Sequence, residues 1–414
     1  MNRNDKRIKY ACYMTNISMA VVTNITALFF LTFRELYDIS YSLLGLLVLV
    51  NFCTQLAVDL LFSFFSHKIN IHTAVRAIPV LTSVGFLLFA TAPVIFPNAV
   101  YIGLLLGTVV FAASGGFSEV LISPIVEALP SENPERELSA LHSVYAWGTV
   151  GVIIVTSLYI LLFGARNWQF LILGFIAIPA VAAILYMSSS LPNIETHERT
   201  ESSASVLKNP ALWLCVLAIF LGGASECVMA QWSSSYLENA LSIPKFWGDI
   251  FGVALFALML GLGRTLYAKY GRRVEKIMLF GAIGASCCYL AAAFSPIPML
   301  GLFACALTGF CVSMLWPGSL IVGADRVVSG GVVMYAMLAA GGDLGASVGT
   351  QLVGVVVDTV AANPDAMSLA ARLGLTPDQL GLKVGMLVGA LFPITAILVY
   401  TYIVKTKSKK DEIS

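Results

Sequence analysis

The polar stretch Ser188–Pro210, SSSLPNIETHERTESSASVLKNP, decides the fold of this chain, because long apolar segments lie on both sides of it. Hydrophobic residues make up 58% of the 414 residues. Charged residues make up 11%, against about 25% in a typical soluble domain. A membrane-spanning helix needs about 20 apolar residues. Twelve segments are long enough, six on each side of the polar stretch, which predicts an all-α membrane protein with twelve transmembrane helices.

The polar stretch also predicts the domain organisation. We expect an N-terminal six-helix half (1–188), a cytoplasmic linker (189–209) and a C-terminal six-helix half (210–414). The predicted spans are residues 11–33, 41–66, 73–92, 98–129, 139–163, 167–188, 210–239, 246–269, 274–294, 297–326, 330–361 and 380–404.

A weak internal repeat supports two related halves. Gly116-Phe117 precedes Pro124 by the same spacing that separates Gly309-Phe310 from Pro317. With the same offset, Ala146 and Gly148 match Ala339 and Gly341. Chance remains an alternative, since the identities are few. A six-plus-six parallel repeat is the organisation of major facilitator transporters, in which the substrate binds near the midplane between the halves.

The distribution of Lys and Arg predicts the orientation. Eighteen of these residues fall on one side of the predicted spans and five on the other, while Arg264 lies inside the eighth span. Cytoplasmic loops carry the excess of basic residues. Both termini are therefore expected in the cytoplasm, and the chain in the inner (plasma) membrane of a bacterium.

Several functional classes are not indicated by the sequence. The net charge of +1 gives no sign of a nucleic-acid partner. The eight cysteines lie in apolar segments without metal-ligand spacing, so we expect buried thiols and neither a metal site nor a cofactor. We find no nucleophile–base arrangement, so an enzyme is not predicted. A phosphate-binding loop is also lacking, which leaves an ion or solute gradient as the energy source.

Four acidic residues lie well inside the predicted spans: Asp59, Glu119, Glu226 and Asp343. A charged side chain at that depth costs at least a few kcal/mol, which makes each acid a functional candidate. Glu119 lies mid-span in GGFSEVLISPIVEALP (115–130) without a basic residue nearby in sequence. It is predicted to load and release the coupling proton; a hydrogen-bonded structural acid is the alternative.

Glu226 and Asp343 are the further proton-coupling candidates. Asp343 is interpreted either as a second titratable site or as a partner of Arg264, and the sequence favours neither. Asp59 continues one helical face with Asn51 and Gln55, at intervals of four residues. Because Asp59 and Arg264 occupy matching places near the cytoplasmic ends of spans two and eight, we predict that they act in gating rather than in substrate contact.

The predicted solute-binding residues are polar or aromatic. In the seventh span, Glu226 is followed by Gln231 and Trp232, a combination that suits hydroxyl groups and the CH face of a sugar. The alternative for Trp232 is an interfacial or packing role. The other predicted binding residues are Asn24 in the first span, and His142 and Tyr145 in the fifth.

Particular patches resemble the fucose–galactose–glucose/proton symporter family of the major facilitator superfamily. The resembling stretches are SEVLISPI (118–125), ELSALHSVYAWGTVG (137–151), Gly223-x-x-Glu226 with Trp232 and Tyr236, and LWPGSL (315–320). The resemblance implies that Glu119 takes part in proton coupling. It also implies transport of a sugar. The stretch Thr23–Ala27 carries no acid where family members commonly have Asp, so fucose itself is not predicted.

Together these features predict a proton-coupled secondary transporter of a sugar or similar small polar solute, working by alternating access. Its expected partners are the solute, protons and the lipid bilayer, and a monomer is expected. One alternative is a proton antiporter that exports an amphipathic compound or drug. Another is a membrane solute sensor with transporter architecture.

Overall fold

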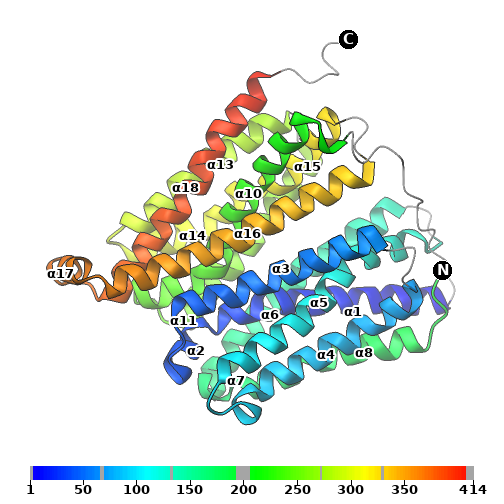
Figure 1. The fold of residues 1–414 in the computed structure, drawn as a ribbon, viewed down its shortest axis with the longest axis horizontal. Helices are drawn as coiled ribbons and strands as arrows, with labels where there is room; N and C mark the ends of the chain where they lie inside the picture. Colours follow the sequence, from blue (N-terminus) through cyan, green and yellow to red (C-terminus); the bar gives the residue numbers. More distant parts are fainter. Residues whose placement is uncertain are drawn as a thin grey trace. The chain divides into compact units, whose positions relative to one another are not determined.

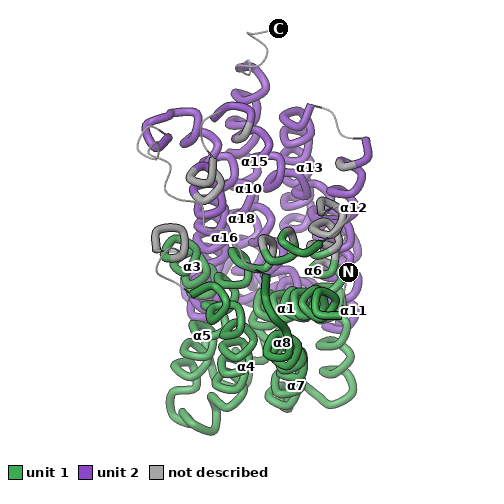
Figure 2. Tube along the Cα trace, turned by 90° about the vertical axis from the view of Figure 1, so that its right-hand side faces the viewer, with its two compact units in different colours: residues 1–39, 50–198 green, residues 40–49, 199–414 purple. Residues whose placement is uncertain are grey.

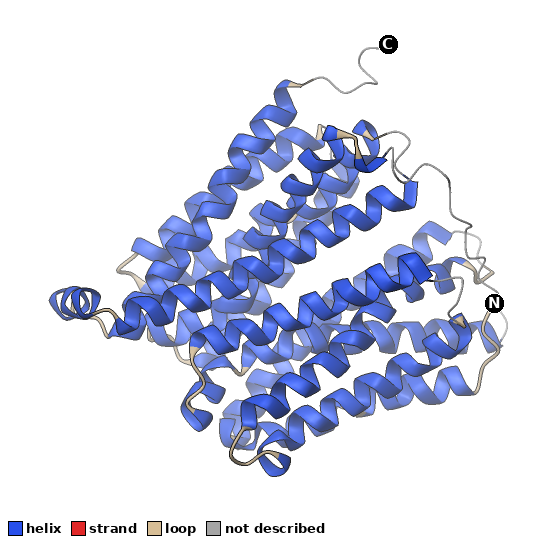
Figure 3. Cartoon of the chain, in the orientation of Figure 1, coloured by secondary structure: helices blue, strands red, loops and turns tan. Residues whose placement is uncertain are grey.

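Helices dominate the computed structural model, which describes residues 3–65, 70–130, 134–192, 206–270, 273–327 and 331–406. No strand occurs among these residues (Figure 3). Eleven described segments are long and apolar enough to cross a membrane, and Trp147–Phe163 is a shorter apolar helix. Helices suit this setting because every backbone polar group in a bilayer must be satisfied within the chain. The predicted all-α fold with twelve spans is confirmed.

The residues pack into two compact units (Figure 2). Unit 1 comprises Met1–Ile39 and Val50–Glu198. Its helices, labelled in Figure 1, are α1 (Arg3–Leu28), α2 (Phe30–Tyr37), most of α3 (Tyr41–Phe65), α4 (Ile71–Ile95), α5 (Val100–Glu127), α6 (Pro134–Phe163), the short η2 (Ala165–Asn167), α7 (Trp168–Phe175) and α8 (Ala177–Met187). Helix α4 packs against α5, and α1 against α6 and α8.

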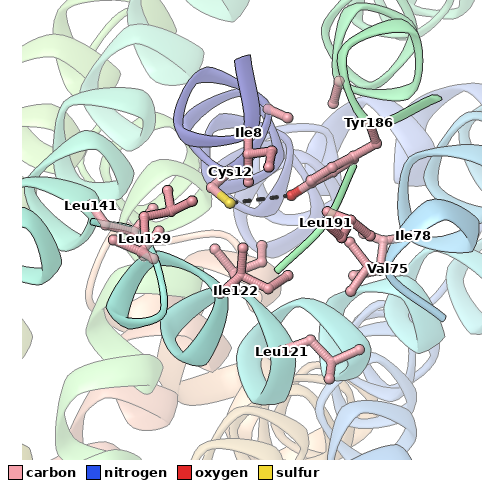
Figure 4. Packing of buried hydrophobic residues seen from close by; sticks show 14 of the residues in the cluster. Ile8, Cys12, Val75, Ile78, Leu121, Ile122, Leu129, Leu141, Tyr186 and Leu191 are labelled. Atoms are coloured by element: carbon pink, nitrogen blue, oxygen red, sulfur yellow. Dashed lines mark hydrogen bonds between the residues drawn. The ribbon is translucent and has the colours of Figure 1, made fainter. Parts of the chain in front are cut away.

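An apolar cluster joins α1, α4, α5, α6 and α8 in unit 1 (Figure 4). The Tyr186 hydroxyl of α8 donates a hydrogen bond to Cys12 Sγ of α1 at 3.4 Å. Leu191, which follows α8, is also buried in this cluster. The first residues after α8 are therefore held by the packing of unit 1. Most of the predicted linker lies outside the described residues.

Unit 2 comprises Ser40–Leu49 and Arg199–Ser414. Its helices are α10 (Pro210–Ser235), the π-helical η3 (Tyr236–Ala240), α11 (Lys245–Gly248), the π-helical η4 (Asp249–Ala254), α12 (Leu255–Tyr270), α13 (Val274–Phe294), α14 (Pro298–Val312), α15 (Leu315–Arg326), α16 (Gly331–Ala362), α17 (Pro364–Arg372) and α18 (Pro377–Lys405). Helix α10 packs against α16 and α18, and α13 against α14 and α18. The predicted boundaries of the two six-helix halves stay a prediction.

The beginning of α3 packs in unit 2, although the rest of α3 belongs to unit 1. The carboxylate of Asp358 accepts hydrogen bonds from the backbone N–H groups of Tyr41 (3.1 Å) and Ser42 (2.6 Å). A Cβ atom at Gly354 would lie 2.5 Å from the Tyr41 carbonyl oxygen, so only glycine permits this approach. Since the first N–H groups of a helix lack intrahelical acceptors, Asp358 caps α3 from α16.

Three predicted spans are broken in the structure: residues 11–33 at Phe29, 167–188 at Ile176 and 297–326 at Ser313. At each break the backbone N–H donates to the carbonyl three residues earlier, at 3.2, 3.2 and 3.3 Å. Pro179 and Pro317 follow the second and third breaks, and proline removes an intrahelical donor. The break at Phe29 has no such signal in the sequence.

Candidate functional site

Two acids meet in unit 1. A Cβ atom at Gly115 of α5 would lie 3.1 Å from the Gln55 side chain, and one at Gly116 would lie 2.8 Å from the Gln55 carbonyl oxygen. Helices α3 and α5 therefore approach closely at this pair of glycines. Asp59 lies one turn beyond Gln55, and Glu119 one turn beyond Gly115. Their carboxylate oxygens lie within 4.8 Å of each other.

The predicted polar face of α3 is ordered. Asn51 donates to the Val22 carbonyl of α1 (3.2 Å), and Gln55 donates to Asn51 Oδ1 (3.1 Å). The next polar residue, Asp59, is half-buried, and its Oδ1 atom is buried without a hydrogen-bond partner among the described residues. Glu119 is exposed. Two carboxylates this close repel each other when both are ionised, so the pair favours holding one proton.

Two facing carboxylates can share a proton, and they can release it when their surroundings change. The pair in unit 1 supplies carboxylate oxygens from two side chains on different helices. The coupling role of Glu119 stays a prediction.

An ion pair forms the polar centre of unit 2. Arg264 Nη2 of α12 donates to both carboxylate oxygens of Glu226 of α10, at 3.3 and 3.2 Å. The side chains are 43% and 18% exposed. The structure shows Glu226 as a partner of Arg264, and the role of Asp343 as a partner of Arg264 stays a prediction. The predicted gating roles of Asp59 and Arg264 stay predictions.

The helix break in span ten positions Arg264. Proline has no N–H group, so Pro317 leaves the carbonyl of Ser313, four residues earlier, without its helical donor. Arg264 Nε donates to this carbonyl oxygen at 3.1 Å. One guanidinium thus connects α10, α12 and the break between α14 and α15.

The ring of Trp316 packs against Gly223, which lies about one helical turn before Glu226 on α10. Trp316 of α15 is half-buried, and a Cβ atom at Gly223 of α10 would lie 3.0 Å from its Cζ3 atom. A Cβ atom at Gly342 of α16 would overlap the same ring. Glycines on both helices therefore make room for Trp316. The sequence signal was present in LWPGSL, but the contact with Gly342 could not be read from it.

Asp343 follows Gly342 and is buried. Ser347 donates to the Asp343 backbone carbonyl at 2.8 Å. The coupling role of Asp343 stays a prediction.

Trp232 does not have the surroundings expected of a solute-stacking residue. Its ring is 0% exposed, and its Nε1 atom donates to the Thr350 carbonyl of α16 at 3.1 Å. Tyr41 packs beside it with ring centroids 5.9 Å apart. This environment suits the packing alternative, and the stacking role stays a prediction. Gln231 is also buried.

The remaining predicted binding residues lie in unit 1. Asn24 is half-buried and donates to the Ala20 carbonyl of its own helix at 2.8 Å. Tyr145 is half-buried on α6, where its carbonyl accepts a hydrogen bond from Thr149. The side chain of His142 lies outside the part of the chain that the structure describes. Solute binding by these residues stays a prediction.

The family model "Major Facilitator Superfamily" matches residues 11–350 of the chain. None of the curated proteins compared matches it in sequence. Solved structures do match in fold. The nucleoside transporter NupG is 14% identical with a TM-score of 0.71, covering 98% of this chain and 100% of that one.

Two sugar transporters of E. coli are also similar in structure. The xylose transporter XylE is 11% identical with a TM-score of 0.72, covering 98% of this chain and 100% of that one. The fucose:proton symporter FucP, in its outward conformation, is 16% identical with a TM-score of 0.58, covering 94% of this chain and 98% of that one. At these identities the likeness shows the fold alone.

Proposed function

The chain belongs to the major facilitator superfamily, and we propose that it is a proton-coupled secondary transporter of a sugar or similar small polar solute, working by alternating access. The observation that carries the proposal is the Asp59–Glu119 pair, whose carboxylate oxygens lie within 4.8 Å on two apolar spans. A shared proton neutralises part of this charge, and its release restores the repulsion. Such a pair can couple proton binding to the conformation of unit 1.

The polar centre of unit 2 supports a solute rich in hydroxyl groups. Arg264 has donor groups beyond those that bind Glu226 and Ser313, since a guanidinium offers five N–H donors. The Glu226 carboxylate can accept hydrogen bonds from hydroxyls. Adjacent donor and acceptor groups match neighbouring hydroxyls of a sugar without requiring a charged solute. Asn24, His142 and Tyr145 are proposed as further polar contacts from unit 1.

The test begins with a thermal-shift screen of purified protein against monosaccharides, including fucose, galactose, glucose and xylose, and against nucleosides. The solute that raises the unfolding temperature is then followed into proteoliposomes under an imposed pH gradient. We expect accumulation against the solute gradient, with proton uptake reported by an internal pH dye. Collapse of the pH gradient should abolish the accumulation.

The coupling pair is tested in the same vesicles. We expect Glu119→Gln and Asp59→Asn to abolish proton-driven accumulation while solute counterflow persists, because each variant keeps the side-chain shape and removes the titrating group. Glu35→Gln, an exposed acid of α2 in the same unit, is the matched control and should transport normally. Undiminished accumulation by Glu119→Gln would show that this acid does not couple the proton.

Two outcomes would favour the alternatives. Export of an amphipathic dye driven by the proton gradient, with no sugar accumulation, would favour the antiporter. A solute that binds without crossing the membrane in any gradient would favour the sensor. Accumulation driven by a sodium gradient would support a secondary transporter that is coupled to sodium instead of protons.

A further inference from the structure

A short helix lies outside the bundle of spans in unit 2. Helix α17 connects the end of α16 at Ala362 to the start of α18 at Pro377 (Figure 1). Both neighbours are long and apolar enough to cross a membrane. The helix therefore lies at the level where two membrane spans end.

Local hydrogen bonds define both ends of α17. The side chain of Asn363 accepts from the backbone N–H groups of Asp365 (2.9 Å) and Ala366 (3.1 Å) at its beginning. At its end, Gly374 adopts φ +69°, and the Leu375 N–H donates to the Ala370 carbonyl at 2.9 Å. The nine residues of α17 are thus capped at both ends.

The two sides of α17 differ in chemistry. Ala366, Leu369, Ala370 and Leu373 follow a spacing of three, four and seven residues, which places them on one face. Ser368 and Arg372 lie together on another face, and Asp365 lies at the boundary between that face and Leu369. Ala370 is fully buried, while Leu369 is 48% and Leu373 58% exposed. The helix therefore contacts the protein through a small residue and leaves its large apolar side chains exposed beside that contact.

Helix α16 also carries an exposed apolar surface. Leu344, Val348, Leu352 and Val355 are exposed at intervals of three or four residues. Asp343, Ser347 and Thr350 of the same helix are buried. An exposed apolar stripe opposite a buried polar one is the side of a span that faces lipid. Leu369 and Leu373 of α17 are exposed shortly beyond the end of this span.

We propose that α17 is an interfacial anchor that lies in the plane of the membrane. Leu369 and Leu373 insert into the boundary between headgroups and acyl chains, about 5–10 Å deep. Ser368 and Arg372 face water, and Asp365 lies at the boundary between the two sides. The helix carries one acid and one base, so the occupant of the apolar side is the acyl region of the bilayer rather than an anionic headgroup. This inference does not rest on the proposed transport activity.

Spin-label accessibility in phosphatidylcholine vesicles tests the orientation. In the full chain with its eight native cysteines replaced, Leu369→Cys, Leu373→Cys, Ser368→Cys and Arg372→Cys are labelled one at a time. We expect the labels at 369 and 373 to collide mainly with oxygen, which concentrates in the bilayer. The labels at 368 and 372 should collide mainly with a water-soluble nickel complex. Equal access of the nickel complex to all four labels would overturn the proposal.

A second measurement uses the native cysteines, in case the cysteine-replaced chain fails to fold. Hydrogen exchange of α17 is compared between lipid nanodiscs with the wild-type chain and with Leu369→Ser/Leu373→Ser. We expect exchange in α17 to be roughly tenfold faster in the double variant, because lipid contact no longer opposes local opening. Ser368→Ala/Arg372→Gln, on the water-facing side, is the control and should exchange like wild type. Identical exchange in all three chains would contradict the anchor.

Discussion

At the residue scale, the surroundings of Trp232 favour a packing role that can be tested against the predicted stacking role. Its ring is fully enclosed and its indole N–H is bonded to the Thr350 carbonyl. We predict that Trp232→Ala lowers the free energy of unfolding by about 3–5 kcal/mol, the usual cost of removing a large buried aromatic side chain. Thermal unfolding in detergent measures the effect.

The control for this prediction is Trp247→Ala, since that ring is exposed and its loss should change stability little. Solute affinity of the Trp232 variant, measured below its unfolding temperature, should stay near that of wild type. A large loss of affinity with unchanged stability would restore the stacking role that the sequence had suggested.

The Glu226–Arg264 pair gives a second prediction at this scale. Glu226→Gln should lower the free energy of unfolding by roughly 1–3 kcal/mol, because Arg264 loses its anionic partner. Solvent around the exposed part of the Arg264 side chain keeps this cost below that of breaking a fully buried pair. The double variant Glu226→Gln/Arg264→Gln should lose less than the sum of the two single variants. Additive losses in thermal unfolding would mean that the two side chains do not interact energetically.

At the element scale, the start of α3 depends on a residue of α16. Asp358→Ala removes the acceptor of two backbone N–H groups and should cost about 0.5–2 kcal/mol, the range for losing a helix N-terminal cap. Hydrogen exchange at the start of α3 should become faster than in wild type. Asp358→Asn retains one acceptor oxygen, so its exchange rate should lie between those of wild type and Asp358→Ala. If exchange there is the same in all three, the carboxylate does not stabilise this end of the helix.

At the scale of the whole molecule, twelve spans require that both termini lie on one side of the membrane. The excess of basic residues predicts that this side is the cytoplasm. Alkaline phosphatase, which is active only outside the cytoplasm, should therefore be inactive when fused at the C-terminus. The same reporter inserted at Gly374, in the turn after α17, should be active. Activity at the C-terminus would refute the predicted orientation.

Local sequence determined the spans and the faces of individual helices. Hydropathy and the 3.6-residue period are properties of a continuous segment, so the twelve spans and the Asn51–Gln55–Asp59 face could be predicted before any contact was known. Pro317 accounts for the break after Ser313, although residues 297–326 were predicted as one continuous span. The break at Phe29 could not be predicted, because its residues carry no proline or glycine signal.

Tertiary structure alone decided which polar groups meet. Glu119 lies beside Asp59 because Gly115 and Gly116 let α5 approach α3. Arg264 binds both Glu226 and the carbonyl oxygen of Ser313, which lacks its helical donor because of Pro317. The enclosure of Trp232 also depends on residues more than a hundred positions away along the chain. A periodic pattern fixes the direction in which a side chain points from its own helix. Its partner depends on the distance between two helices, which is set by packing between residues far apart in sequence.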